Sequence, residues 1–478
     1  MNSVGAVTAQ PGQVIGQAIL DILDMGKVSK TWAVFPGLRR DDSVTILRRF
    51  ARMTTALPCA IWPTTMEVDD LLDSRPLLLL SMLVAASSSQ PRLQSESDEI
   101  YRHALADRVI VQGQRSLDLL HSLLTYLTWY HHRFSPKTQQ FFQYLQLANG
   151  MAADLGLSKQ CEGPSIFQNL DDARTFLLCY YLNCGAAVLG YDRSEYMPDI
   201  GRARKAAPLV AASRQMPPDH MAPAMVELFW LAAEVVRSLH DGSRGSTAVE
   251  AEVIHEHLHQ WKQQFLDPDP SISPSIISSY EFVRGYLFVE LNRHGAIDLG
   301  PSSPHVVECL QSMRRLLDHI LRQPPPYVLE LGIIEWGHIL TALLVFARLE
   351  SKCGAVQTPL FMNYIGQFGA RVAELRSSRD ESYQAPNLIF WLESILTFVH
   401  HKAASLSANA AAAEGEKGST YELLQAVPDR TSRNSTVAGK PQASVSTTGD
   451  CQPLEGHSQA GLSDEDVWLD IMSNWLNW

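Results

Sequence analysis

Residues 117–134 read LDLLHSLLTYLTWYHHRF, and this stretch decides the fold class. Its apolar and aromatic side chains recur every three or four residues, which is the period of an α-helix. One stripe consists of Leu117, Leu120, Leu124, Leu127, His131 and Phe134, and a second consists of Leu119, Leu123, Tyr126 and Tyr130. Because a helix with two apolar faces is normally enclosed by other helices, we expect this one to be buried.

The same period continues along the chain on both sides of this stretch. Phe141, Leu145, Ala148 and Ala152 keep helical spacing, and Gly156 is placed to end that helix. Further helices are expected at about 171–189, 225–239, 276–292, 304–322, 328–350, 357–377 and 385–402. No stretch alternates as a strand does, so the sequence predicts an all-α, multi-helix array. Its core should contain Leu120, Leu124, Leu127 and Phe141.

Composition divides the chain into four expected segments. Residues 1–70 mix Pro, Gly and short apolar runs without a strong period, and 71–402 form the helical array. Residues 403–461 are rich in Ala, Ser, Thr and Gly, and we expect a disordered linker there because they bury too little apolar surface to fold. Residues 462–478 are acidic and aromatic. The longest apolar run, at 76–86, is too short to span a membrane.

Charge and cysteine usage narrow the function classes. The chain has 478 residues and a formal net charge of −12, which argues against a surface held to nucleic acid by phosphate neutralisation. Its seven cysteines are widely spaced and odd in number, so reduced thiols in the cytosol or nucleus are expected. No pair has C-x-x-C spacing, and we predict no metal or other cofactor.

Catalytic motifs are absent from the sequence: it contains no G-x-S-x-G, Walker or H-E-x-x-H pattern. His255 and His259 share a helix face, as zinc ligands would, but a solvated helix face is the simpler interpretation. Cys179 and Cys184 are expected to be buried core thiols. The basic cluster of Arg202, Arg204 and Lys205 is interpreted as a solvated loop, with a nuclear import signal or a DNA-facing edge as alternatives. His131 and His132 are interpreted as helix-end histidines that favour the dipole.

Residues 74–157 carry several blocks whose order and spacing are specific. They read RPLLLL at 75–80, AAS at 85–87, LADRVI at 105–110, LTYLTWYH at 124–131 and MAADLGL at 151–157. This region resembles the middle homology region of fungal zinc binuclear-cluster transcription factors, especially regulators near secondary-metabolite genes. The resemblance extends, fading, to about residue 400.

The resemblance implies an all-α regulatory domain and gene regulation in the nucleus. Members of the family usually begin with six cysteines that hold two zinc ions, whereas only Cys59 precedes residue 161 here. No residue inherits a zinc-ligand role, and direct DNA binding by the chain is expected to be weak. The expected partners are a DNA-binding transcription factor or a coactivator, and both a homodimer and a heterodimer stay open. The alternative function is a helical metabolic enzyme whose site is assembled from scattered polar residues.

The last residues have the pattern of a transcriptional activation segment. Ser463 to Asp466 form a capping box, so a short amphipathic helix is expected to begin there. Its apolar face would consist of Trp468, Leu469, Ile471, Met472, Trp475 and Leu476. A helix this short orders when that face meets an apolar groove, such as one on a coactivator. The alternative is that the segment docks onto its own helical domain.

Overall fold

A computed structural model describes residues 40–63, 66–133, 140–157, 169–188, 199–240, 244–268, 272–293, 304–353 and 358–377. In this part of the chain there are fifteen α-helices and no strand, so the all-α prediction is confirmed. The N-terminal helices are α2 (Arg40–Met53), α3 (Val68–Ser74), α4 (Pro76–Ala86), α5 (Pro91–Leu105), α6 (Leu117–Thr128), α7 (Phe141–Asp154) and α8 (Leu170–Val188). The C-terminal helices are α9 (Ile200–Ser213), α10 (Ala222–His240), α11 (Arg244–Trp261), α12 (Pro274–Arg293), α13 (Pro304–Arg322), α14 (Pro325–Val328), α15 (Ile333–Cys353) and α16 (Thr358–Ser377).

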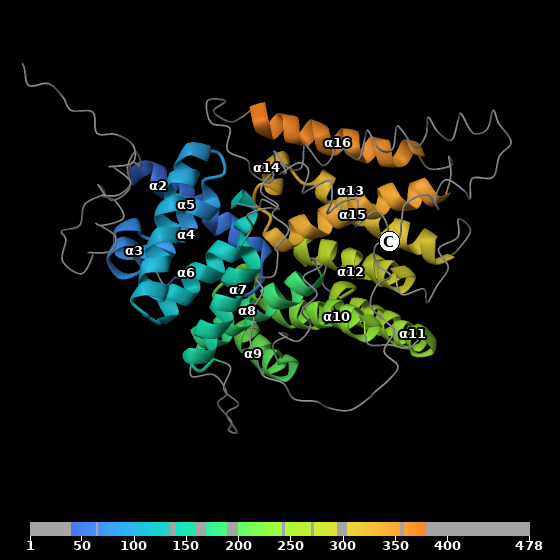
Figure 1. The fold of residues 1–478 in the computed structure, drawn as a ribbon, viewed down its shortest axis with the longest axis horizontal. Helices are drawn as coiled ribbons and strands as arrows, with labels where there is room; N and C mark the ends of the chain where they lie inside the picture. The colour runs from blue at the N-terminus through green and yellow to red at the C-terminus, as the bar shows by residue number, and fades with distance from the viewer. Residues whose placement is uncertain are drawn as a thin grey trace, which may run out of the picture.

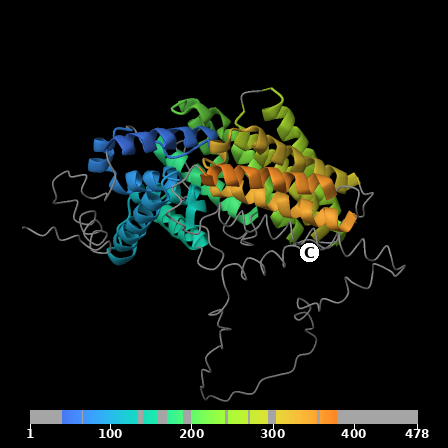
Figure 2. The same ribbon diagram turned by 90° about the horizontal axis from the view of Figure 1, so that it is seen from above.

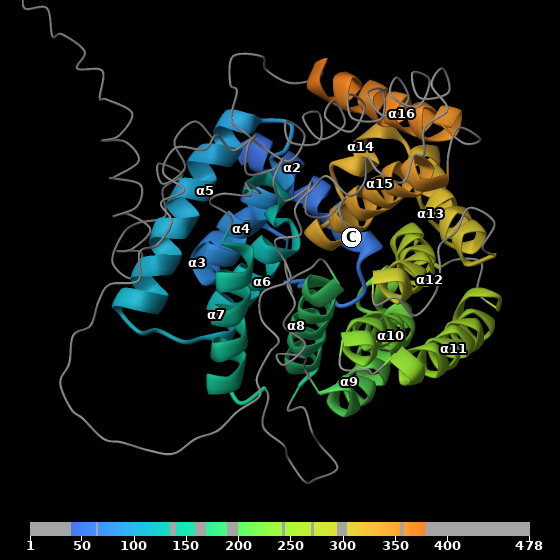
Figure 3. The same cartoon turned by 45° about the vertical axis from the view of Figure 1, so that its right-hand side comes forward.

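The helices form two groups that share one core. Figure 1 shows α2–α6 on the left and α10–α13, α15 and α16 on the right, with α8 and α9 between them. The same separation is visible from above in Figure 2. When the molecule is turned, α8 still lies between α7 and α10 (Figure 3). Buried apolar residues of both groups belong to a single contiguous cluster, so the groups are packed together without a polar gap.

Helix α4 is the centre of the N-terminal group. Pro76 occupies its first turn, where a missing backbone N–H costs nothing. All ten residues from Leu77 to Ala86 are buried, which leaves α4 without a solvated face. The hydroxyl of Ser81 is accommodated because it donates to the carbonyl of Leu78 at 2.8 Å. Helices α2, α3, α5 and α6 all pack against α4.

Helix α8 joins the two groups. Every residue from Ala173 to Val188 is buried. The helix packs against α6 and α7 in one group and against α9, α10 and α15 in the other. Its one buried cation, Arg174, makes two hydrogen bonds to the carboxylate of Asp219, at 2.7 and 2.8 Å. This pairing offsets the cost of removing both charges from water.

The helix expected from 117–134 is shorter than its apolar stripes. It begins at Ser116, whose hydroxyl accepts from the backbone N–H of Leu119 at 3.1 Å, and it ends at Thr128. At Trp129 the backbone leaves the helical region, because the indole N–H donates to the carbonyl of Glu330 at 3.0 Å and the ring packs on Phe50. Residues 130–133 then form a 3-10 turn, η4. The contact between Trp129 and Glu330 therefore ends the helix at a point where the apolar period alone would continue it.

The core prediction is confirmed, and two further elements differ from expectation. Leu120, Leu124, Leu127 and Phe141 are at most 1% exposed. Residues 40–53 form α2 although their region shows no strong period, since α2 is stabilised by packing on α4. The helix expected at 328–350 is divided at Gly332, where a Cβ atom would lie 2.9 Å from the carbonyl oxygen of Thr128. The chain therefore passes the end of α6 before α15 begins.

The expected helix at 385–402, the linker at 403–461 and the segment at 462–478 lie outside the described residues. Among the helices that the structure does describe, none combines the length and the apolar character that a membrane span requires.

Replacing Leu124 with Ala should lower the free energy of unfolding by about 2–5 kcal/mol, because the lost methyl groups leave a cavity in a fully buried site. Leu209→Ala on α9 is the matched control. Leu209 is 50% exposed, so its truncation should cost less than about 0.5 kcal/mol. Urea unfolding of the two variants measures the difference, and equal costs would contradict the buried position of Leu124.

Candidate functional site

Asp98 is the most highly connected buried charge in the N-terminal group. It lies on α5 with its side chain 1% exposed. Four side chains contact the carboxylate: Tyr126 at 2.7 Å, Arg102 at 3.0 Å, His132 at 3.1 Å and Arg133 at 3.3 Å. Tyr126 and His132 contact Oδ1, whereas both arginines contact Oδ2. A buried carboxylate is tolerated only when its lone pairs are satisfied in this way.

Three separate elements supply these partners. Arg102 is one helical turn from Asp98 on α5, and Tyr126 comes from α6. His132 and Arg133 come from η4, which the end of α6 at Thr128 brings into place. His132 lies at a helix end, as expected, and its Nδ1 atom contacts the carbonyl oxygen of Trp129, the C-cap residue of α6, at 2.9 Å. The sequence analysis missed the second contact, in which the Nε2 atom of His132 meets the buried carboxylate of Asp98.

The surroundings hold Asp98 in its charged form. Burial alone would raise the pKa of Asp98, but the hydrogen bond from His132 and the positive charges around it outweigh burial and lower the pKa to about 2. Burial and the negative charge of Asp98 raise the pKa of Tyr126 well above its usual value. Tyr126 therefore stays protonated and serves as a hydrogen-bond donor to the carboxylate.

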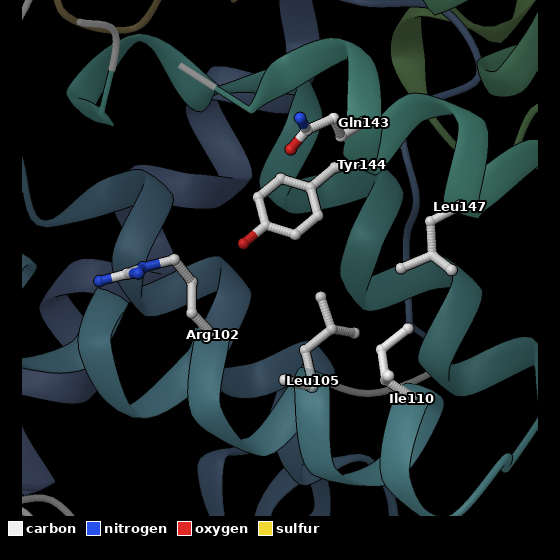
Figure 4. A pocket seen from close by; sticks show the side chains of 7 residues that line it. Arg102, Leu105, Ile110, Gln143, Tyr144 and Leu147 are labelled. Carbon is white, nitrogen blue, oxygen red and sulfur yellow. The ribbon is translucent and has the colours of Figure 1, made fainter. Parts of the chain in front are cut away.

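A pocket of about 260 Å³ lies beside this centre. Figure 4 shows the side chains around it, and they come from α5, from the turn that follows it and from α7. The lining residues are Arg102, Leu105, Ala106, Ile110, Gln143, Tyr144 and Leu147. Arg102 is shared, because its Nε atom donates to Asp98 while the side chain borders the pocket. The pocket therefore adjoins the Asp98 charge network through Arg102.

The turn after α5 is a π-helix, η3, at Ala106–Val111. Single π-helical turns are rare and occur frequently at functional sites. This one exposes two large apolar side chains, Ile110 at 66% and Val111 at 76%. Ile110 forms part of the pocket wall. Exposed apolar residues that adjoin a pocket are typical of ligand-binding surfaces.

The structure also places the other residues singled out in the sequence. Cys179 and Cys184 are buried thiols, as predicted. His259 is exposed and contacts Gln263 at 2.9 Å. The described residues contain no group of three or more His, Cys, Asp or Glu side chains arranged to hold a metal ion.

The basic cluster at 202–205 is not a solvated loop, because it lies on α9. Arg202 is buried, 5.4 Å from the ring centre of Phe176. Arg204 makes two hydrogen bonds of 2.7 Å to Glu227. Arg202 and Arg204 therefore have partners within the fold, while the side chains of Arg204 and Lys205 stay exposed to solvent.

The segment predicted to activate transcription lies outside the described residues. Its expected face consists of Trp468, Leu469, Ile471, Met472, Trp475 and Leu476. The Asp98 centre and its pocket, by contrast, were missed by the sequence analysis. The available signal was an acid on the buried stripe of α5, in step with Tyr101 and Leu105.

The comparisons with known proteins point to transcription. Over 103 residues, the chain is 32% identical to the protein named transcription factor opdL of Penicillium oxalicum. It is related over this segment to a fungal transcription factor. The matched segment makes up 22% of this chain and 18% of that protein, so most of the relative's length has no counterpart in the match. No protein-family model and no solved structure matches the chain.

Replacing Asp98 with Asn should lower the free energy of unfolding by about 3–5 kcal/mol at pH 7, because Arg102 and Arg133 would lose their buried counter-ion. The folded-state pKa lies below the usual value, so the stabilisation is present above about pH 4 and is lost as the pH falls towards 2. The difference in unfolding free energy between the natural chain and the variant should therefore be as large at pH 5 as at pH 7. It should become smaller only below about pH 4.

Asp154→Asn is the matched control for this prediction. Asp154 pairs with Arg115, but its side chain is 51% exposed, so its loss should cost less than about 1 kcal/mol. Chemical unfolding followed by circular dichroism at several pH values measures both variants. A deficit for Asp98→Asn that disappears between pH 7 and 5 would contradict the assigned charge state.

Proposed function

We propose that the chain is a nuclear transcription regulator that controls a secondary-metabolite gene cluster. The observation that carries the proposal is the match of 103 residues to a fungal transcription factor. The blocks at 74–157 are consistent with it, because they resemble the regulatory region of fungal zinc-cluster transcription factors. In this proposal the helical array is a regulatory module, and the chain acts with a DNA-binding partner factor or a coactivator.

The charge of the chain is the reason for assigning DNA contact to a partner and activation to the chain itself. The net charge of −12 disfavours binding to the DNA backbone, and two of the three cations at 202–205 are already paired or buried. The acidic and aromatic segment at 463–478 has the composition of a ligand for an apolar groove with a basic rim. We infer that the chain contributes activation, while the partner supplies most of the DNA contact.

When the chain is tethered to a foreign DNA-binding domain, it should activate a reporter gene. The double substitution Trp468→Ala with Trp475→Ala should lower that output severalfold, since it removes the two largest anchors of the apolar face. Asn474→Ala with Asn477→Ala is the matched control and should leave the output unchanged. The melting temperature of the chain should stay the same in both variants. A fall of several degrees in the tryptophan variant would show instead that the segment packs on the helical domain.

The purified chain should bind DNA only weakly, with a Kd of about 1 µM or higher at physiological salt, and with little sequence preference. Fluorescence anisotropy with a random and a promoter-derived duplex measures this. Nanomolar, sequence-selective binding by the chain alone would overturn the proposed need for a DNA-binding partner.

A further inference from the structure

Two of the large apolar side chains that the described residues expose are neighbours in η3. Val111 is 76% exposed and Ile110 is 66% exposed, more than any other large apolar side chain in this part of the chain. The other exposed ones, Leu209, Val253 and Val307, lie singly on α9, α11 and α13. Single exposed apolar residues are ordinary on a protein surface, whereas a contiguous group marks an interaction site.

The exposed pair continues into the pocket between α5 and α7. Ile110 lines the pocket together with Leu105 and Leu147, and most of the lining residues are apolar. Figure 4 shows Ile110 and Leu147 on one side of the pocket and Arg102 on the other. We call Leu105, Ile110, Val111 and Leu147 the η3 patch. It combines two exposed side chains with an adjoining hollow, so it offers apolar surface to another protein surface.

Helix α7 extends the η3 patch with a small residue. Gly150 follows Leu147 by three residues, about one helical turn, and it is exposed. A Cβ atom added to Gly150 would meet no other atom within 4 Å, so the space beside the helix is open. A glycine inside a helix costs stability relative to alanine, and no neighbouring atom requires one here. Its effect is to let another helix approach α7 closely.

Charged side chains of both signs flank the η3 patch. Arg102 and Tyr144 line the pocket near the start of α7, whereas Arg115 pairs with Asp154 at the end of α7. The segment from Arg102 to Arg115 therefore runs beside α7 in the same direction. A two-fold axis across the middle of α7 would turn a second copy so that its Asp154 lies opposite Arg102. A partner of a single charge sign would instead meet a like charge at one end.

We propose that this face joins two copies of the chain in a two-fold dimer, with the two α7 helices antiparallel. The η3 patches of the two copies cover each other, which removes Ile110 and Val111 from water. The exposed charges, Arg102 of one copy and Asp154 of the other, fix the register of the contact more than its affinity. The inference goes beyond the proposed function, and neither depends on the other.

The oligomeric state of the full-length chain tests the proposal. One copy has a mass of 53.2 kDa, and sedimentation equilibrium should show the average mass rising towards twice that value with concentration. A contact of this limited size should give a Kd of roughly 1–50 µM. Val111→Asp should weaken the dimer at least about tenfold, because it places two like charges in the apolar contact. Val307→Asp on α13 is the matched control and should leave the Kd unchanged.

A second pair of variants tests the approach of the two α7 helices. Gly150→Gln fills the open space beside α7 and should also weaken the dimer about tenfold. Gly366→Gln on α16 is its control, since Gly366 is equally open and exposed. Gly150→Cys lies close to the proposed axis, so oxidation with diamide should link two copies, whereas Gly366→Cys should give no more linked dimer than the natural chain. Melting curves recorded well below the Kd should match the natural chain for the aspartate and glutamine variants, because each change is on the surface of a single copy.

Three results would overturn the proposal. One is a chain that stays monomeric up to about 100 µM, above the expected range of Kd. Another is a dimer whose Kd is the same in the Val111 and Gly150 variants, or which is linked through Gly366→Cys and not through Gly150→Cys, since its contact would then lie elsewhere. The third is a monomer that binds a fluorescent peptide of residues 463–478 and loses this binding with Val111→Asp. The occupant of the face would then be the C-terminal segment of the chain.

Discussion

Helices α4 and α8 are buried around their whole circumference, and each must therefore be enclosed by other helices. Enclosing α4 requires α2, α3, α5 and α6, while enclosing α8 brings α6 and α7 together with α9, α10 and α15. The two requirements share α6, which explains why the two groups of helices form one core instead of two domains. The outer C-terminal helices pack one layer further out, with α11 and α12 on α10 and with α13 and α16 on α15.

Because so much of the structure is buried, few charged side chains lie inside it, and the two described next are paired with opposite charges. Arg174 on α8 pairs with Asp219, and Asp98 on α5 is surrounded by Tyr126, His132 and two arginines. The first pair lies deep inside the core, with side chains 2% and 0% exposed. The second lies near the surface, where its surplus guanidinium charge borders a pocket.

Local pattern predicted most of the fold and little of the candidate site. The stripes through Leu120 and Leu124 identified a buried helix, because the period of three to four residues depends only on neighbours in sequence. The end of that helix at Thr128 was not predictable, since it depends on Trp129 reaching the carbonyl of Glu330 about two hundred residues later. Asp98 was hidden for a related reason: it stands among the polar residues QSESDE at 94–99, and its partners on α6 and η4 become neighbours only after folding.

The central claim is that this chain regulates transcription together with a partner that supplies DNA contact. Chromatin immunoprecipitation of the tagged, full-length chain tests it most directly, in cells with and without a candidate zinc-cluster factor. The account predicts enrichment at discrete promoters that include a secondary-metabolite gene cluster, and loss of that enrichment when the partner factor is deleted. Recovery of no promoter above the untagged background, from cells in which the chain is abundant, would contradict the claim.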